Sequence, residues 1–220
     1  MAIQKQKFNE ARNGSDFRIG GREFVITESL LTGSAVETCL EELASLRLNI
    51  FHEYPYLYDG CREDELKYLR LYKDTPEAFV LSATDSGDMI GAATGLPLRH
   101  EVETLINPFV GTSYPVDELF YIGEVLFYPS YRERGLGIRL LNRIDEYVCN
   151  LGNYRYLTCA TVVRPENHEQ RPENYVPIDR FLNRTGFIKL PGITTSFAWK
   201  EIDGCNREHP MQFWVKELCL

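Results

Sequence analysis

The most informative segment of this chain covers residues 123–141 and reads Gly123-Glu124-Val125-Leu126-Phe127-Tyr128-Pro129-Ser130-Tyr131-Arg132-Glu133-Arg134-Gly135-Leu136-Gly137-Ile138-Arg139-Leu140-Leu141. Its first part is an apolar run typical of a strand, and the apolar spacing after Gly137 is typical of a helix. Backbone N–H groups are free where a helix begins, and that end carries a partial positive charge. The segment therefore predicts an anion site, above all for a pyrophosphate.

The loop between this strand and helix supplies the predicted contacts. Glycines have no Cβ, so they let a ligand approach the backbone closely. Arg132 or Arg134 is expected to reach a phosphate, and Arg139 adds positive charge nearby. We expect the pyrophosphate to be held by the N–H groups of five successive residues: Arg134, Gly135, Leu136, Gly137 and Ile138.

The glycine spacing separates this loop from two common phosphate loops. A Walker A loop ends in Gly-Lys-Ser/Thr and a dinucleotide fingerprint has three glycines, and the segment matches neither. The order Arg-x-x-Gly-x-Gly, after a strand and a proline, resembles the acetyl-coenzyme A loop of the GNAT N-acetyltransferase superfamily. A second segment, residues 180–187, resembles that family's short helix ending in Gly-Phe beside the cofactor thiol. The alternative, a tight turn before an arginine-rich surface helix, is weakened by this second match.

The composition indicates a soluble globular protein, and we expect residues 1–220 to form a single domain. The net charge of −8 argues against nucleic acid as the main partner. No apolar run approaches the roughly 20 residues that a membrane helix needs. The six cysteines are scattered without a Cys-x-x-Cys pair, which favours reduced thiols and a cytoplasmic protein over disulfides or a zinc site.

The apolar periodicity predicts an α/β fold. Residues 1–21 read as a loose leader, and residues 100–115 as a surface loop or short helix. Strands are predicted at residues 23–27, 78–83, 89–94, 119–128, 156–162, 195–202 and 211–218, and helices at residues 34–50, 64–72, 138–151 and 178–185. Ser34 and Glu37 fit a capping box at the start of the first helix. This order predicts a mixed sheet with helices on both faces, which is also the order of the GNAT fold.

The resemblance implies direct transfer of an acetyl group from acetyl-coenzyme A to an amine. An amine with a pKa of about 10 is mostly protonated at neutral pH, so a base must remove its proton. Glu124 is the leading candidate because it is a carboxylate inside an otherwise apolar strand. Partial desolvation there makes it a better base. The alternative is a strand-edge or salt-bridged glutamate, paired with an arginine.

The resemblance also implies contacts to the cofactor arm and a proton donor for the leaving thiolate. The backbone of Leu126 and Phe127 is expected to hold the pantetheine amides, and Asn174 to contact the arm. Many GNAT enzymes carry a tyrosine four residues before the glycine of the Gly-Phe ending, and Leu182 occupies that position here. Tyr175 is the first substitute and Tyr156 the second, unless both tyrosines only pack.

The acceptor is expected between the first two predicted helices, where GNAT proteins commonly build its pocket. The segment reads Phe51-His52-Glu53-Tyr54-Pro55-Tyr56-Leu57-Tyr58-Asp59-Gly60. Tyr54, Tyr56, Tyr58 and Asp59 can receive a cation through ring faces and a carboxylate. The alternative is a loop whose aromatic side chains pack on the core.

The sequence therefore predicts an acetyl-coenzyme A-dependent N-acetyltransferase that acts on a small-molecule amine and uses no metal. Acetylation of a protein amine and a catalytically silent acyl-coenzyme A-binding module remain open, the latter because of Leu182. A homodimer through the C-terminal strands is a further expectation from the family. A cysteine hydrolase built on Cys159 and His168 is disfavoured, because the two residues have no recognisable triad spacing.

Overall fold

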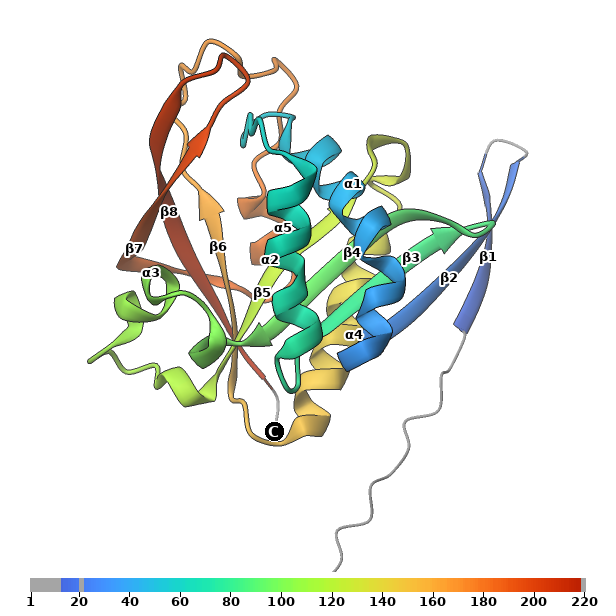
Figure 1. Cartoon of the computed structure of the whole chain (residues 1–220), viewed down its shortest axis with the longest axis horizontal. Helices are drawn as coiled ribbons and strands as arrows, with labels where there is room; N and C mark the ends of the chain where they lie inside the picture. The colour runs from blue at the N-terminus through green and yellow to red at the C-terminus, as the bar shows by residue number, and fades with distance from the viewer. Residues whose placement is uncertain (1–12, 20–21, 219–220) are drawn as a thin grey trace, which may run out of the picture.

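The computed structural model describes residues 13–19 and 22–218. The strands form one eight-stranded sheet in the order β1-β2-β3-β4-β5-β6-β8-β7 (Figure 1). They are β1 (Asn13–Ile19), β2 (Arg22–Thr32), β3 (Phe79–Asp85), β4 (Asp88–Pro97), β5 (Leu119–Phe127), β6 (Tyr156–Val162), β7 (Ile188–Lys200) and β8 (Asn206–Glu217). Only the β5–β6 pair is parallel among the paired strands, so the sheet is mixed, as predicted.

Helices cover both faces of this sheet. In Figure 1, α1 (Leu40–Phe51) and α2 (Arg62–Asp74) lie in front, and α4 (Leu136–Leu151) lies behind. Two clusters of buried apolar residues follow this division, one between the sheet and α1 and α2, the other between the sheet and α4. The shorter helices are α3 (Glu103–Ile106) and α5 (Asp179–Arg184). The predicted α/β architecture is confirmed.

Helix α4 shows how closely the apolar pattern sets an element. Its buried residues recur at helical spacing at Leu140, Leu141, Ile144 and Val148, and they pack on the sheet. The helix ends at Gly152, whose φ of 73° lies in the left-handed region that side chains other than glycine rarely adopt. The predicted helix and its stop are both present.

Two local predictions are wrong. The expected first helix begins instead as the 3-10 segment η1 (Gly33–Cys39), and only then continues as α1. Its N-cap is Thr32, with no side-chain cap hydrogen bond, so the capping box of Ser34 and Glu37 does not form. Within the expected leader, Asn13–Ile19 form β1 and pair with β2. The rest of that leader, residues 1–12 and 20–21, lies outside the described residues.

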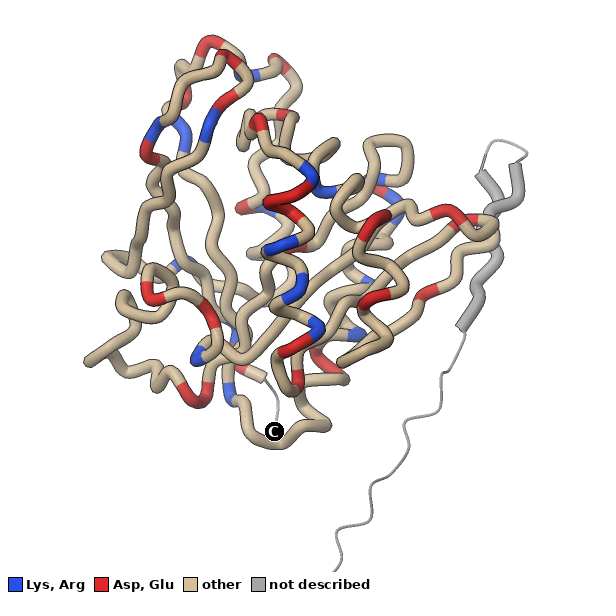
Figure 2. Tube along the Cα trace, in the orientation of Figure 1, with Lys and Arg blue, Asp and Glu red and all other residues tan. Residues whose placement is uncertain are grey.

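The predicted hairpin at residues 78–94 is confirmed as β3 and β4, with Ser86 and Gly87 at the turn. The predicted loop at residues 100–115 contains α3 and short 3-10 turns. No helix in the described part of the chain is long and apolar enough to cross a membrane. Figure 2 shows acidic and basic positions interspersed along α1, α2 and the β7–β8 hairpin.

Candidate active site

The sheet opens between β5 and β6. These strands pair only from Leu119–Tyr121 to Tyr156–Thr158, whereas β6 continues beside β8 as far as Val162. Beyond Tyr121, the β5 edge that faces β6 therefore has no paired strand in the described structure. A strand edge of this kind presents N–H and C=O groups that can bind an extended ligand.

The register shows which peptide groups face this gap. Tyr128 N–H donates to Ile90 O of β4 at 3.0 Å, with Phe127 opposite Gly91. In an antiparallel pair this makes Phe127 a non-hydrogen-bonded position, so its N–H and C=O point away from β4. By the same alternation, the N–H and C=O groups of Val125 point toward the gap, and those of Leu126 point toward β4. The expected contact through Phe127 fits this geometry, and the one through Leu126 does not.

A β-bulge brings Glu124 to the face covered by α1 and α2. Thr94 of β4 lies opposite Glu124 and the next residue, Gly95, lies opposite Ile122, so Gly123 is an extra residue on β5. A Cβ at Gly123 would lie 2.3 Å from Tyr72 Oη of α2, so any larger residue would have to displace that hydroxyl. The bulge thus turns two successive residues toward the helices.

Arg47 of α1 links two buried carboxylates. It donates from Nε to Glu65 of α2 and from a terminal nitrogen to Glu124 Oε2. The side chains of Arg47, Glu65 and Glu124 are 11%, 4% and 3% exposed, so the cluster is inside the protein. Glu124 is therefore a glutamate salt-bridged to an arginine, which is the alternative that the sequence left open. Its other oxygen, Oε1, is buried and has no hydrogen-bond partner among the described residues.

This cluster carries one negative charge more than it carries positive. Aromatic rings enclose its cation, because Arg47 Cζ lies 4.9 Å from the Phe51 ring centroid and 4.8 Å from that of Tyr68. A buried excess of negative charge favours a neighbouring cation or donor. The unpartnered Oε1 of Glu124 is the atom at which such a donor would be accepted.

A third buried carboxylate and two tyrosines extend the polar cluster. Tyr68 and Tyr72 share a hydrogen bond of 2.9 Å between their hydroxyls. Glu101 is 7% exposed, and burial raises its pKa to about 7, with a further contribution from the charge of Glu124. The sequence analysis missed Arg47 and Glu101. Arg47 could have been found, because a charged residue four positions after Leu43 falls on the buried stripe of α1. Nothing in the sequence around Glu101 indicates that it is buried.

The phosphate loop has the predicted form. Gly135 is the N-cap of α4 with φ +76°, and the first helical hydrogen bond runs from Arg139 N–H to Gly135 O at 3.1 Å. The N–H groups of Leu136, Gly137 and Ile138 therefore open the helix without partners inside it. A Cβ at Gly137 would lie 3.3 Å from the Phe181 ring, so α5 packs beside this loop. The two predicted motifs lie together, and the helix start suits a phosphate.

The arginines of the loop have different surroundings. Arg132 donates from Nε to Phe127 O at 2.9 Å, and its guanidinium lies 3.0 Å from the Glu53 carboxylate. Arg139 pairs with the buried Glu28 at 2.8 Å. Arg134 lies over the Tyr131 ring, 5.6 Å from its centroid. Arg132 thus joins the phosphate loop to residues 52–61, which we call the α1–α2 loop.

The candidate proton donors are aromatic packing partners in this structure. Leu182 is 6% exposed and belongs to the core cluster under α4. Tyr175 meets Tyr54 edge-on, with ring centroids 4.7 Å apart, and partial burial raises its pKa. Tyr156 packs edge-on against Tyr114 at 5.2 Å. Asn174, the other residue expected near the cofactor arm, is exposed.

The predicted acceptor residues of the α1–α2 loop separate into different surroundings. Burial raises the pKa of Tyr56, and its ring packs between Phe51 at 4.7 Å and Trp199 at 6.0 Å. Burial raises the pKa of Tyr58 to about 12, with the charge of Glu65 contributing. Asp59 pairs with Lys200 at 2.5 Å. The carboxylate expected to receive a substrate cation thus already has a partner.

The described residues do not support the cysteine-hydrolase alternative. Burial raises the pKa of the Cys159 thiol to about 12, which disfavours the nucleophilic thiolate at neutral pH. His168 instead accepts a hydrogen bond from Gln170 N–H at 3.2 Å and packs against Tyr54. No group of three or more His, Cys, Asp or Glu residues in the described chain is arranged to hold a metal ion.

Solved structures share this fold. An N-acetyltransferase from Staphylococcus aureus Mu50 superposes with a TM-score of 0.56 at 13% identity, over 87% of this chain and 99% of its own. A ribosomal-protein-alanine N-acetyltransferase from Brucella melitensis gives 0.55 at 18% identity, over 86% and 99%. An aminoglycoside 6'-N-acetyltransferase complexed with coenzyme A gives 0.55 at 12%, over 87% and 97%.

The sequence itself supplies the assignment. No curated protein matches the chain closely enough to serve as a relative. The model of the Acetyltransferase (GNAT) family matches residues 41–171, more than half of the chain. This span includes the Arg47–Glu124 pair, the gap between β5 and β6, and the phosphate loop. The protein is therefore a member of the GNAT acetyltransferase family, a family of acyltransferases that use acetyl-coenzyme A.

Proposed function

We propose that this protein acetylates a primary amine of a small cationic molecule, with Glu124 as the base. The observation that carries the proposal is the buried Glu124 carboxylate beside the gap in the sheet. One of its oxygens is held by Arg47, and the other has no partner among the described residues. An acceptor atom left unpaired inside a protein is costly, and a substrate donor would satisfy it.

The cofactor fits the open backbone groups beside this carboxylate. Acetyl-coenzyme A supplies the acyl group as a thioester. The N–H groups of Leu136, Gly137 and Ile138, with the charge of Arg134, would hold its pyrophosphate. The outward peptide groups of Val125 and Phe127 would hold the pantetheine amides, so we move the backbone contact from Leu126 to Val125.

Glu124 is placed to take the proton of the amine. Arg47 orients the carboxylate through Oε2 and leaves Oε1 as the acceptor. The same guanidinium also donates to Glu65, so its positive charge is shared between two carboxylates. Tyr175, which packs on Tyr54, remains the proposed proton donor to the leaving thiolate.

The substrate class follows from charge and burial. The cluster of Arg47, Glu65 and Glu124 has an excess negative charge, which favours an ammonium group. The side chain of Glu124 is only 3% exposed, so the amine must reach it on a slender group such as an aminoalkyl chain. The relatives of this fold include enzymes for a small molecule and for a ribosomal protein. The burial of Glu124 favours a small molecule over a protein as the acceptor.

The test is a thiol-release assay with acetyl-coenzyme A against polyamines, amino acids, aminoglycosides and short peptides. Cofactor binding is measured separately by calorimetry. We expect binding together with turnover on an aliphatic amine. Turnover on peptides alone would favour a protein substrate, and binding without turnover on any amine would favour a silent module. Failure to bind acetyl-coenzyme A would contradict the assignment of the phosphate loop.

A further inference from the structure

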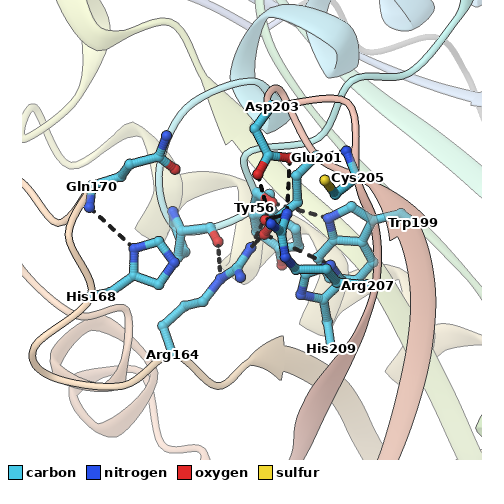
Figure 3. Close-up of polar contacts among 11 residues, drawn as sticks. Tyr56, Arg164, His168, Gln170, Trp199, Glu201, Asp203, Cys205, Arg207 and His209 are labelled. Atoms are coloured by element: carbon cyan, nitrogen blue, oxygen red, sulfur yellow. Dashed lines mark hydrogen bonds and ion pairs between the residues drawn. The ribbon is translucent and has the colours of Figure 1, made fainter.

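A buried ion cluster outside the proposed reaction centre holds the α1–α2 loop (Figure 3). Arg164 follows the end of β6, and its side chain is only 9% exposed. Its Nε donates to Pro55 O at 2.6 Å, and a terminal nitrogen donates to Tyr56 O at 2.8 Å. One guanidinium therefore binds two successive carbonyl groups of this loop.

A second strand contributes to the same carbonyl. Trp199 of β7 donates its indole N–H to Tyr56 O at 3.0 Å. The Trp199 ring is itself stacked on His209 of β8, with centroids 3.7 Å apart. A carbonyl oxygen has two lone pairs, so Arg164 and Trp199 together use the full accepting capacity of Tyr56 O.

The charge of Arg164 is balanced inside the protein. Glu201 is 6% exposed; its Oε1 lies 2.6 Å from Arg164, and its Oε2 accepts from Arg207 at 2.6 Å. Figure 3 shows these side chains converging below the β7–β8 turn, where Arg207 also pairs with Asp203. Replacing one member would leave a buried charge without its partner.

Backbone pairing extends the same attachment. Tyr58 forms an antiparallel bridge with Glu201, Asp59 N–H donates to Lys200 O at 2.8 Å, and Ile202 N–H donates to Leu57 O at 2.9 Å. Figure 1 shows the α1–α2 loop beside the β7–β8 hairpin. The N-terminal end of the α1–α2 loop contacts the phosphate loop through the ion pair of Glu53 and Arg132 at 3.0 Å.

These contacts determine where the Tyr56 side chain lies. Three hydrogen bonds fix the peptide groups on either side of it, and the ring lies 4.7 Å from Phe51. The Tyr56 ring is thereby kept against Phe51, whose own ring lies 4.9 Å from the Arg47 guanidinium that holds Glu124. A buried ion pair rarely stabilises a fold more than apolar residues of the same size would. The two-carbonyl geometry of Arg164 instead selects one conformation of the loop.

We infer that Arg164 and Glu201 are positioning residues, which hold residues 55–58 so that Tyr56 lines the acceptor side of the proposed reaction centre. This inference rests on the proposed function. Among the described residues, the hydrogen bonds and ion pairs of Arg164 and Glu201 do not involve the phosphate loop, so their loss should affect the amine and not acetyl-coenzyme A.

The experiment compares Arg164→Met and Arg164→Lys in the full chain. Lysine keeps the charge opposite Glu201 but cannot donate to both carbonyls from a planar fork. Two readouts are used: hydrogen exchange of the peptide covering residues 53–60, and separate measurement of the acetyl-coenzyme A Kd and the amine KM and kcat. The amine is the best substrate of the panel described above. Arg155→Met is the control, because Arg155 makes an exposed ion pair with Glu217 elsewhere on the sheet.

We expect Arg164→Met to accelerate exchange in residues 53–60 and to raise the amine KM, each by roughly 10-fold or more, as loss of charged hydrogen bonds implies. The acetyl-coenzyme A Kd should stay within about 2-fold, since the phosphate contacts are retained. Arg164→Lys should fall between Arg164→Met and the native chain. If Arg164→Met does not fold, Glu201→Gln, which keeps the shape of the cluster, should give the same pattern in weaker form.

Unchanged exchange in residues 53–60 of folded Arg164→Met would overturn the inference. An equal rise in the amine KM and the acetyl-coenzyme A Kd would also overturn it, since it would indicate a general loss of structure. If the native chain acetylates no amine, the proposed function fails. The exchange readout then decides separately whether Arg164 holds the loop.

Discussion

The guanidinium of Arg47 donates a hydrogen bond to the carboxylate of Glu124 inside the protein. Arg47 comes from the third turn of α1, and Glu124 reaches it because a bulge at Gly123 turns β5. Helix and strand thus define together which oxygen of Glu124 is held and which is left to accept a proton. The pair is therefore an orienting contact, and the base role can be separated from it by substitution.

Glu124→Gln should lower turnover on the amine by about 100-fold or more near neutral pH, the usual contribution of a general base. The amide keeps the shape of the side chain and its contact with Arg47 through oxygen, but it cannot take a proton. Steady-state kinetics and calorimetry should show a lower kcat with an unchanged acetyl-coenzyme A Kd.

Glu65→Gln is the matched control, because Glu65 binds the same guanidinium and is equally buried. It removes the same charge from the cluster without removing the proposed base. A fall in kcat as large as that of Glu124→Gln would show that cluster charge, and not the base, limits turnover.

Arg134→Ala should weaken acetyl-coenzyme A binding by roughly 5- to 10-fold, because an ion pair between its guanidinium and a phosphate contributes about 1 kcal/mol. Arg143→Ala, on α4 in a half-buried pair with Glu146 at 3.8 Å, is the control. Calorimetry at two salt concentrations should show a reduced salt dependence for Arg134→Ala. Equal Kd values for both variants would contradict the phosphate role of Arg134.

The bulge glycine can be tested through its neighbour. A Cβ at Gly123 would lie 2.3 Å from Tyr72 Oη and 2.7 Å from Thr94 Oγ1, closer than van der Waals contact allows. Gly123→Ala should therefore lower the free energy of unfolding by about 1–3 kcal/mol, as overpacking does. Urea denaturation measures this loss.

The same substitution should cost less in a Tyr72→Phe background, because the nearest obstructing atom is then absent. Part of the loss in stability should remain, since Thr94 Oγ1 still lies close to the added Cβ. Equal losses in the two backgrounds would show that the hydroxyl of Tyr72 is not what excludes a side chain at Gly123.

The order of elements could be predicted from sequence because each is set by local pattern. The stripe of α4 with Gly152, and the turn of Ser86 and Gly87, are examples in which apolar spacing and turn residues agree. The start of the first helix could not be predicted in this way. Ser34 and Glu37 fit a capping box in sequence, but the chain there forms a 3-10 segment. That choice depends on how Val36 and Cys39 are buried, which is a tertiary effect.

The candidate site divides in the same way. The phosphate loop was predictable because Gly135 and Gly137 act through their own backbone. The partner of Glu124 was not identifiable, since Arg47 lies 77 residues away in sequence. The preference for Val125 over Leu126 at the gap follows from strand register, which no local pattern encodes.

Glu101 gives the molecule a pH dependence of known sign. Burial raises its pKa from 4.5 to about 7 in the folded chain. Between these values the folded state keeps a proton that the unfolded state has lost, so stability falls as pH rises from about 4.5 to 7. Above pH 7 the loss is complete, at roughly 3 kcal/mol.

Glu101→Gln should abolish this fall in stability with pH, because glutamine does not titrate. The variant should differ little from the native chain at pH 4.5 and be more stable at pH 8, as measured by urea denaturation at both values. Glu103→Gln, at an exposed position on α3, serves as the control. A difference between Glu101→Gln and the native chain that stays constant with pH would contradict a buried, titrating Glu101.

Arg47→Met should destabilise the protein by about 3–5 kcal/mol, because it leaves two buried carboxylates without their shared cation. Methionine fills much of the same volume, so lost charge and not a cavity dominates the loss. The triple variant Arg47→Met, Glu65→Gln, Glu124→Gln removes all three charges and should recover most of the stability while remaining inactive. Urea denaturation of the two variants measures the difference. If the triple variant is as unstable as Arg47→Met, packing around Arg47 between Phe51 and Tyr68 stabilises the fold more than charge balance does.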